Sequence, residues 1–116
     1  MSHKFGTVDI CGHKFPVIEK TSDEDQSLET CSGYIRFKPQ EIVIEAAMEP
    51  EAFRDVLLHE VLHGILHLSG ATDVIATAMG TDRSNPAVDT LEESFIRIVT
   101  PHLVAALASM KGLKVK

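Results

Sequence analysis

The chain has 116 residues, of which 44% are hydrophobic and 24% are charged. This composition is typical of one globular domain, which we expect to span residues 1–116. The net charge of −6 and the pI near 5.4 argue against a nucleic-acid partner and against an anionic membrane surface. No apolar run is long enough to span a bilayer and no signal-peptide pattern is visible. We therefore expect a cytoplasmic protein in which Cys11 and Cys31 are reduced thiols, with a single disulfide as the alternative.

The first half of the chain predicts two β-hairpins. Gly12-His13 is expected to form the turn of the first, and residues 38–40 the turn of the second. Pro16 cannot donate a hydrogen bond to a neighbouring strand, so its strand is expected to be an edge strand or a bulged one. Residues 21–30 are polar and acidic, which predicts a solvated loop with at most one helical turn. The four strands are expected at residues 7–11, 14–18, 33–37 and 41–44.

A central helix is predicted from Pro50 to about Leu68, because Pro suits the first helical position and Ser69-Gly70 favours a helix end. Residues 73–79 fit a short helix, and residues 80–86 read as a loop.

The last helix is expected from residue 87 or 88 to Lys111, with a frayed tail at residues 112–116. Pro101 should kink or locally unwind it, because proline removes one backbone hydrogen bond. Helical spacing predicts one apolar face toward the core, made of Leu91, Phe95, Ile98, Val99, Leu103 and Ala106.

The most informative stretch is an H-E-x-x-H motif formed by His59, Glu60 and His63. Positions i and i+4 share one helical face, so the two imidazoles can converge on one metal ion. Glu60 is rotated by about 100° from His59, which places it beside the metal, where it could take a proton from a water. Apolar side chains occupy most of the remaining circumference, which predicts a buried helix in which two histidines and a glutamate need a partner.

A catalytic zinc takes three protein ligands and keeps one position for water, so a third ligand is required. His67 lies about 12 Å along the helix axis from His59, too far for both to hold one ion. We interpret His67 as structural or as lining the cleft, and His102 as a core histidine or one that supports a ligand. Glu92 and Glu93, at the start of the last helix, are the remaining candidates.

The order of these motifs resembles the gluzincin arrangement, in which a Glu at the start of a second helix follows H-E-x-x-H. More closely, residues 30–105 resemble the small zincin-like metallopeptidases of phages and mobile elements that are related to ImmA/IrrE-type proteins. This resemblance implies an α+β fold, with a small antiparallel or mixed sheet of two hairpins packed on the central helix and the C-terminal helix. It also implies that Glu93 is the third ligand, with Glu92 as the alternate.

The resemblance further implies a hydrolase that cuts peptide bonds in a peptide or protein substrate, with one Zn²⁺ per chain and Glu60 as general base. Tyr34, His67 and His102 are candidates for stabilising the oxyanion. Asp73 and Asp89 are candidates for orienting a ligand histidine. The strand Glu41–Glu45 is either an edge on which the substrate docks or an ordinary core strand.

Two other functions remain open from the sequence. The chain could bind zinc as a regulatory or interaction module without hydrolysing peptides, or it could be a metal-free helical interaction domain. An intact Glu60 argues against the first of these, because a structural zinc site needs no base. The loop at residues 80–86 or the tail could cover the cleft of a latent enzyme.

Overall fold

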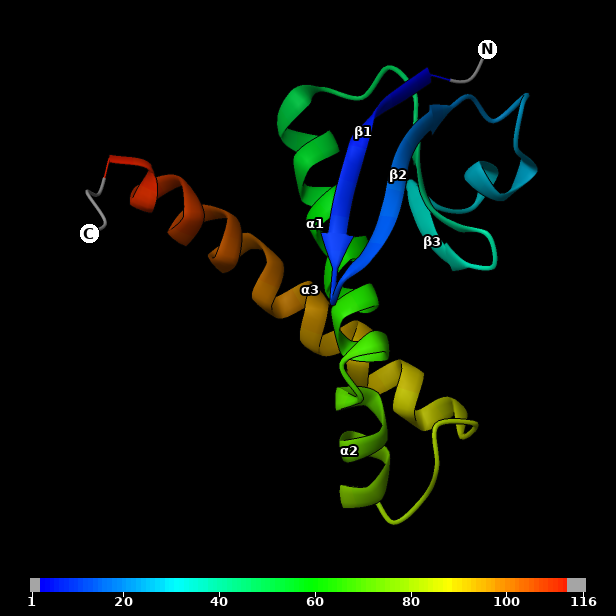
Figure 1. Cartoon of the computed structure of the whole chain (residues 1–116), viewed down its shortest axis with the longest axis vertical. Helices are drawn as coiled ribbons and strands as arrows, with labels where there is room; N and C mark the ends of the chain where they lie inside the picture. The colour runs from blue at the N-terminus through cyan, green and yellow to red at the C-terminus, as the bar shows by residue number, and fades with distance from the viewer. Residues whose placement is uncertain (1–2, 113–116) are drawn as a thin grey trace.

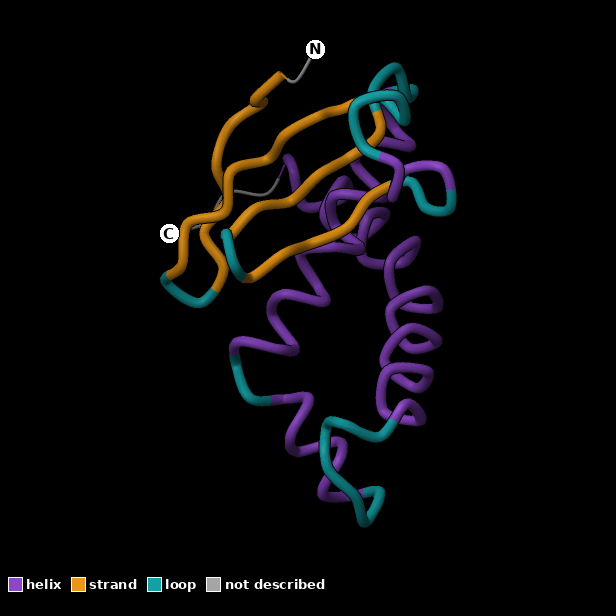
Figure 2. The backbone as a smooth tube through the Cα atoms, turned by 90° about the vertical axis from the view of Figure 1, so that its right-hand side faces the viewer, coloured by secondary structure: helices purple, strands orange, loops and turns teal. Residues whose placement is uncertain are grey.

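The computed structural model describes residues 3–112, which form an α+β fold with a four-stranded sheet followed by three α-helices. Figure 2 shows the sheet as one layer with the helices on one side of it. The predicted fold class is therefore confirmed. The strands are β1 (His3–Ile10), β2 (His13–Lys20), β3 (Gly33–Phe37) and β4 (Gln40–Glu45), and the helices are α1 (Pro50–Leu68), α2 (Ala71–Ala78) and α3 (Pro86–Ser109). Two short 3-10 helices are η1 (Gln26–Glu29) and η2 (Met110–Gly112), and the remainder of the predicted frayed tail, residues 113–116, lies outside the described residues.

The sheet has the strand order β1-β2-β4-β3 and contains both predicted hairpins. The hairpins join through a parallel pairing of β2 with β4, in which Val17 lies opposite Ile42. The strand of Pro16 is an inner strand, so its expected edge position is wrong. The strand Glu41–Glu45 is also an inner strand, which agrees with the second of its two interpretations, an ordinary core strand. Pro16 is tolerated because the pairing with β4 begins one residue later, and the irregularity in this hairpin lies in β1, between Lys4 and Gly6.

The first hairpin turns at Cys11-Gly12, one residue earlier than predicted. Both residues have positive φ angles, 52° and 84°, as a tight two-residue turn that matches the strand twist requires. The Asp9 carboxylate accepts a hydrogen bond of 2.8 Å from the Gly12 N–H and so fixes the turn. Ile10 consequently pairs with His13, and its side chain enters the core.

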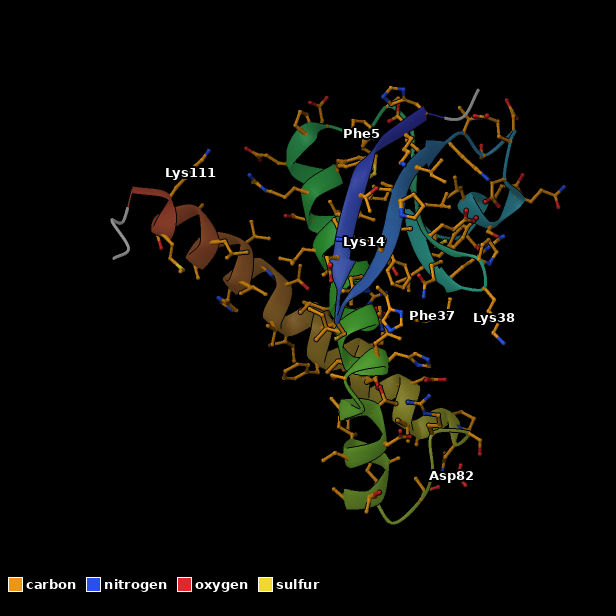
Figure 3. All side chains as sticks on the ribbon, viewed as in Figure 1. Phe5, Lys14, Phe37, Lys38, Asp82 and Lys111 are labelled. Atoms are coloured by element: carbon orange, nitrogen blue, oxygen red, sulfur yellow. The ribbon has the colours of Figure 1, made fainter. Side chains whose placement is uncertain are left out.

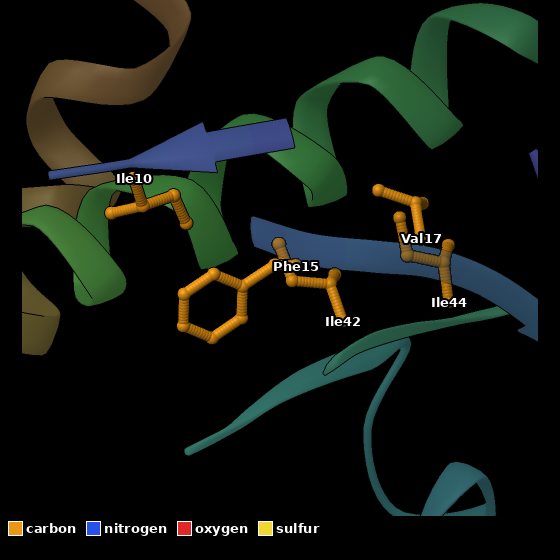
Figure 4. Close-up of a cluster of buried hydrophobic side chains, with 5 residues drawn as sticks. All are labelled: Ile10, Phe15, Val17, Ile42 and Ile44. Atoms are coloured by element: carbon orange, nitrogen blue, oxygen red, sulfur yellow. The ribbon is translucent and has the colours of Figure 1, made fainter. Parts of the chain in front are cut away.

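The core lies between the sheet and α1 (Figure 4), and its fully buried side chains are Ile10, Phe15, Val17, Ile42 and Ile44. α1 approaches the sheet closely at Gly64, where a Cβ atom would lie 2.8 Å from Cδ1 of Ile35. Val43 is also fully buried, although its strand position points to the opposite face of the sheet. Tyr34 pairs with Val43 in the sheet, so its side chain lies on the same face. The hydroxyl of Tyr34 donates a hydrogen bond to Asp25, which brings the segment 21–30 against this face.

The helix limits agree closely with the predictions. α1 begins at Pro50 and ends at Leu68, and Gly70 follows it with a φ of 87°. The side chain of Asn85 caps α3 by accepting a hydrogen bond of 2.9 Å from the Ala87 N–H. α3 continues through Pro101 without unwinding. Within residues 3–112, no helix has the length and apolar character needed to cross a membrane.

The predicted buried face of α3 is wrong. Three of its apolar side chains are largely exposed, at 47% for Leu91, 53% for Phe95 and 68% for Ile98. The buried positions of α3 are instead Val88, Glu92, Ile96 and Thr100. Figure 1 shows that α3 crosses α1, and Figure 3 shows side chains extending from its C-terminal part on several sides. α1 is also less buried than expected, since only Glu60 and Gly64 are fully buried in it.

Candidate metal centre

α1 places two imidazole rings side by side on the surface that α3 crosses. His59 and His63 are four residues apart in a regular helix, and their ring centroids lie 5.0 Å from each other. Both side chains are about a quarter exposed, so their ring nitrogens are partly shielded but still reachable from solvent.

α3 brings one carboxylate to both rings. Oε1 of Glu93 lies 2.7 Å from Nε2 of His59, and Oε2 lies 3.3 Å from Nε2 of His63. His59, His63 and Glu93 each offer one ligand atom, and these three atoms lie within 4.8 Å of one another. Among residues 3–112, no other group of His, Cys, Asp or Glu side chains meets this criterion. The structure therefore contains a candidate metal triad made of His59, His63 and Glu93.

The two contacts that Glu93 makes with the histidines can be compared with the spacing of ligand atoms around zinc. Two ligand atoms bound at 2.0–2.2 Å to a tetrahedral zinc are about 3.4 Å apart. The 3.3 Å distance between Nε2 of His63 and Oε2 of Glu93 is close to this value, whereas the 2.7 Å distance between Nε2 of His59 and Oε1 of Glu93 would have to lengthen by about 0.7 Å. Two imidazole nitrogens and one carboxylate oxygen are also donors that zinc accepts, with a fourth position left for a water or a substrate.

The electrostatics of the triad favour the protonation states that bind metal. Burial lowers the pKa of His59, outweighing the opposing attraction of the Glu93 carboxylate, so its imidazole is neutral at pH 7. Burial also disfavours the charge on Glu93, but His59, His63 and Arg97 together outweigh this effect and lower the pKa of that carboxyl. Metal ligation needs neutral imidazoles and an ionised carboxylate, and the lowered pKa values of His59 and Glu93 both favour these states.

Glu60 lies beside the triad and is itself a buried carboxyl, only 8% exposed. Burial, followed by the negative charge of Glu93, raises the pKa of Glu60 to about 7. A carboxyl with a pKa near neutrality can both accept and return a proton at physiological pH. The second residue of the motif thus has the environment that a general base requires.

The triad and Glu60 open into one cleft of about 650 Å³. One wall is formed by the residues that lead into β3, and β3 is an edge strand of the sheet. The opposite wall is formed by α3. The cleft is lined by Thr30, Cys31, Ser32, Gly33, Asp55, Val56, His59, Glu60, His63, Glu93, Arg97, Thr100 and Pro101.

Several residues predicted to assist the site lie elsewhere. His67 stacks on Phe37 with ring centroids 4.2 Å apart, which supports the structural interpretation of this histidine. His102 is exposed, so its expected place in the core is wrong. The hydroxyl of Tyr34 is held by Asp25, and neither Tyr34 nor the loop at residues 80–86 lines the cleft.

The supporting carboxylates are also different from those expected. Asp73 pairs with Arg83 at 2.9 Å, and Asp89 is exposed near the start of α3. Oε1 of Glu92 instead lies 3.9 Å from Nδ1 of His63. Sequence reasoning also missed Arg97, whose Nε lies 3.3 Å from Oε1 of Glu93. Its position four residues after Glu93 was the available signal, because such pairs meet on a helix surface.

Cys11 and Cys31 are both exposed and free, so they are not joined in a disulfide.

Comparison of the chain with models of protein families, with curated proteins and with solved structures gave no match. Any functional conclusion must therefore come from the chemistry and placement of the chain's own residues.

Proposed function

We propose that this chain is a zinc-dependent metallopeptidase in which His59, His63 and Glu93 hold the metal and Glu60 is the general base. The observation that carries this proposal is the burial of Glu60 in the same cleft as the candidate triad. A buried carboxyl is costly, and a purely structural zinc site gains nothing from one next to its ligands. A hydrolytic site needs a carboxyl group next to the metal ligands, because a base must remove a proton from the attacking water.

The mechanism follows from the positions of these groups. Zinc, when bound, supplies Lewis acidity that acidifies a water and polarises a carbonyl group. Nε2 of His59, Nε2 of His63 and one oxygen of Glu93 would hold the ion. Glu60 accepts the proton of the water at its carboxylate and later delivers it to the departing amine. The pKa of about 7 for Glu60 in the metal-free protein suits both transfers.

The walls of the cleft suit an extended peptide. β3 pairs with β4 on one side and is an edge strand, so its other side can add a substrate strand by main-chain hydrogen bonds. Ser32 and Gly33 bring the start of this edge to the cleft. Arg97 is the cation among the lining residues, and its guanidinium is placed to stabilise negative charge that develops on the substrate carbonyl.

The gluzincin-like assignment is part of the same proposal. It is supported by the motif on α1, by the arrival of Glu93 from the first part of the following long helix, and by the sheet that precedes both. The resemblance to small zincin-like metallopeptidases of phages and mobile elements rests on these features alone.

The test is the digestion of a mixture of unfolded proteins by zinc-loaded protein, with cleavage products identified by mass spectrometry. We expect the wild type to cut, and Glu60→Gln to lose cleavage while keeping its zinc. Glu51→Gln removes an equivalent charge from the exposed start of α1 and should cut like the wild type. Zinc-loaded, folded wild type that cuts nothing would contradict the peptidase proposal and would favour a zinc-binding interaction module. Cleavage by Glu60→Gln at the wild-type rate would contradict the role of Glu60.

A further inference from the structure

Glu92 is a buried carboxyl group on the buried side of α3. It lies one helical turn from Val88 and one turn from Ile96, both of which are fully buried. Glu92 itself is 6% exposed, and its Oε2 has no hydrogen-bond partner among the described residues. Burying an uncompensated carboxylate costs several kcal/mol or more, so its presence here calls for a specific partner.

The nearest ring nitrogen belongs to His63, which stands between two carboxylates. Its Nε2 faces Glu93 at 3.3 Å, and its Nδ1 faces Oε1 of Glu92 at 3.9 Å. The second distance is too long for a hydrogen bond in the metal-free structure. Such contacts commonly tighten when a site is loaded, and a small rotation of the ring or of the carboxylate closes this gap.

We propose that Glu92 positions His63 for zinc: its carboxylate accepts a hydrogen bond from Nδ1–H and thereby presents Nε2 to the metal. The inference rests on the proposed zinc site. A neutral imidazole carries one proton, and a partner at one nitrogen decides which nitrogen is left to bind metal. Glu92 therefore acts through His63 and touches neither the metal nor the substrate.

This role explains why two adjacent glutamates of α3 face His63. Glu92 and Glu93 are about 100° apart around the helix, so their side chains can approach the His63 ring from different directions. Glu93 contacts Nε2 of His59 and Nε2 of His63. Glu92 lies near the other ring nitrogen of His63, Nδ1. Each nitrogen of His63 thus has a carboxyl group within 4 Å of it.

The test compares zinc affinity with the stability of the metal-free protein. Zinc affinity is measured by competition with a coloured chelator, and stability by thermal denaturation in the presence of a strong chelator. Glu92→Met fills a similar volume without a charge and should weaken zinc binding about 10–100-fold. The same variant should unfold at a higher temperature without metal, because it removes a buried polar oxygen that has no hydrogen-bond partner among the described residues. Glu92→Gln keeps an acceptor oxygen and should bind zinc more tightly than Glu92→Met.

Asp23→Asn is the control, because it removes an exposed carboxylate that does not line the cleft and should leave both quantities unchanged. Wild-type zinc affinity in Glu92→Met would overturn the proposal, even if its metal-free stability changes. If Glu92→Met does not fold, NMR of zinc-loaded wild type and Glu92→Gln decides instead. A His63 Nδ1 proton resonance that moves between the wild type and Glu92→Gln supports the proposal, and a resonance at the same position in both proteins overturns it.

Failure of this inference can be told apart from failure of the proposed function. If the wild type binds zinc, His63→Ala does not, and Glu92→Met binds like the wild type, then only the role of Glu92 is wrong. If the wild type binds no zinc at all, both proposals are wrong.

Discussion

Nε2 of His59 and Oε1 of Glu93 lie 2.7 Å apart, and this contact joins the motif on α1 to the following long helix. The same carboxylate reaches His63, so α3 is fixed against α1 by the groups that are proposed to bind zinc. The metal-free fold therefore already holds the candidate ligand atoms within 4.8 Å of one another.

The burial of Glu60 predicts a pH dependence of stability in the metal-free protein. Its folded pKa of about 7 lies above the ordinary value of 4.5, so the folded state holds the proton more tightly than the unfolded state. Stability should therefore fall as pH rises from about 4.5 to about 7, by on the order of 3 kcal/mol.

The side chain of Glu60→Gln cannot titrate, so the stability of this variant should not show the fall between about pH 4.5 and 7 that Glu60 causes in the wild type. Denaturation by urea with a chelator present, repeated across this pH range, should show the two proteins equally stable near pH 4 and the variant more stable at pH 7. A stability difference that does not change with pH would contradict the raised pKa of Glu60.

The contact between Tyr34 and Asp25 should be visible in a titration of tyrosine absorbance. Tyr34 is the single tyrosine of the chain, and the chain has no tryptophan, so the signal has one source. Burial, with a further contribution from Asp25, raises the pKa of Tyr34 to about 12. Asp25→Asn should lower this midpoint but leave it above the ordinary value of 10, because burial remains. Asp23→Asn alters an exposed neighbour and should leave the midpoint at the wild-type value; an equal shift in both variants would argue against the contact.

A side chain at Gly33 should disturb the edge of the cleft. A Cβ atom there would lie 2.9 Å from the carbonyl oxygen of Val43 and 2.7 Å from Cγ1 of Val56. The carbonyl belongs to the neighbouring strand and cannot move freely, so Gly33→Ala should cost about 1–3 kcal/mol of unfolding free energy. Gly6→Ala is the control, because no atom lies within 4 Å of its Cβ position. Equal stability of the two variants in chemical denaturation would contradict the close approach at Gly33.

The orientation of α3 is tested by two isoleucines. Ile96 is fully buried, whereas Ile98 is 68% exposed. Ile96→Ala should therefore destabilise the protein by about 2–5 kcal/mol. Ile98→Ala should change its stability by less than about 0.5 kcal/mol. The reverse order in thermal or urea denaturation would mean that the face predicted from hydrophobic spacing is the buried one.

Features that depend on neighbouring residues were predictable from the sequence. The limits of α1 follow from Pro50 and Gly70, and the convergence of His59 and His63 follows from helical spacing. The meeting of these histidines with Glu93 agrees with the prediction that rested on family resemblance, although its role as a ligand remains a prediction.

Features that depend on distant contacts were not predictable in the same way. The parallel pairing of β2 with β4 leaves no local signal, so the sequence does not decide whether the strand Glu41–Glu45 is an edge or a core strand. α3 is turned so that Glu92 and Glu93 face the histidines of α1, and this contact overrides the apolar stripe that contains Leu91, Phe95 and Ile98. Hydrophobic periodicity alone could not have anticipated that a glutamate would occupy the buried side.

The most direct test of the central proposal is the zinc content of the purified protein, measured by elemental analysis after excess metal is removed. The wild type and Glu60→Gln should each retain about one zinc per chain, since a catalytic site holds one ion by three ligands and Glu60 is not among them. His63→Ala and Glu93→Ala should lose it while their helices remain folded by circular dichroism. Zinc that is absent from the wild type after reloading, or that survives in both ligand variants, would contradict the metal centre made of His59, His63 and Glu93.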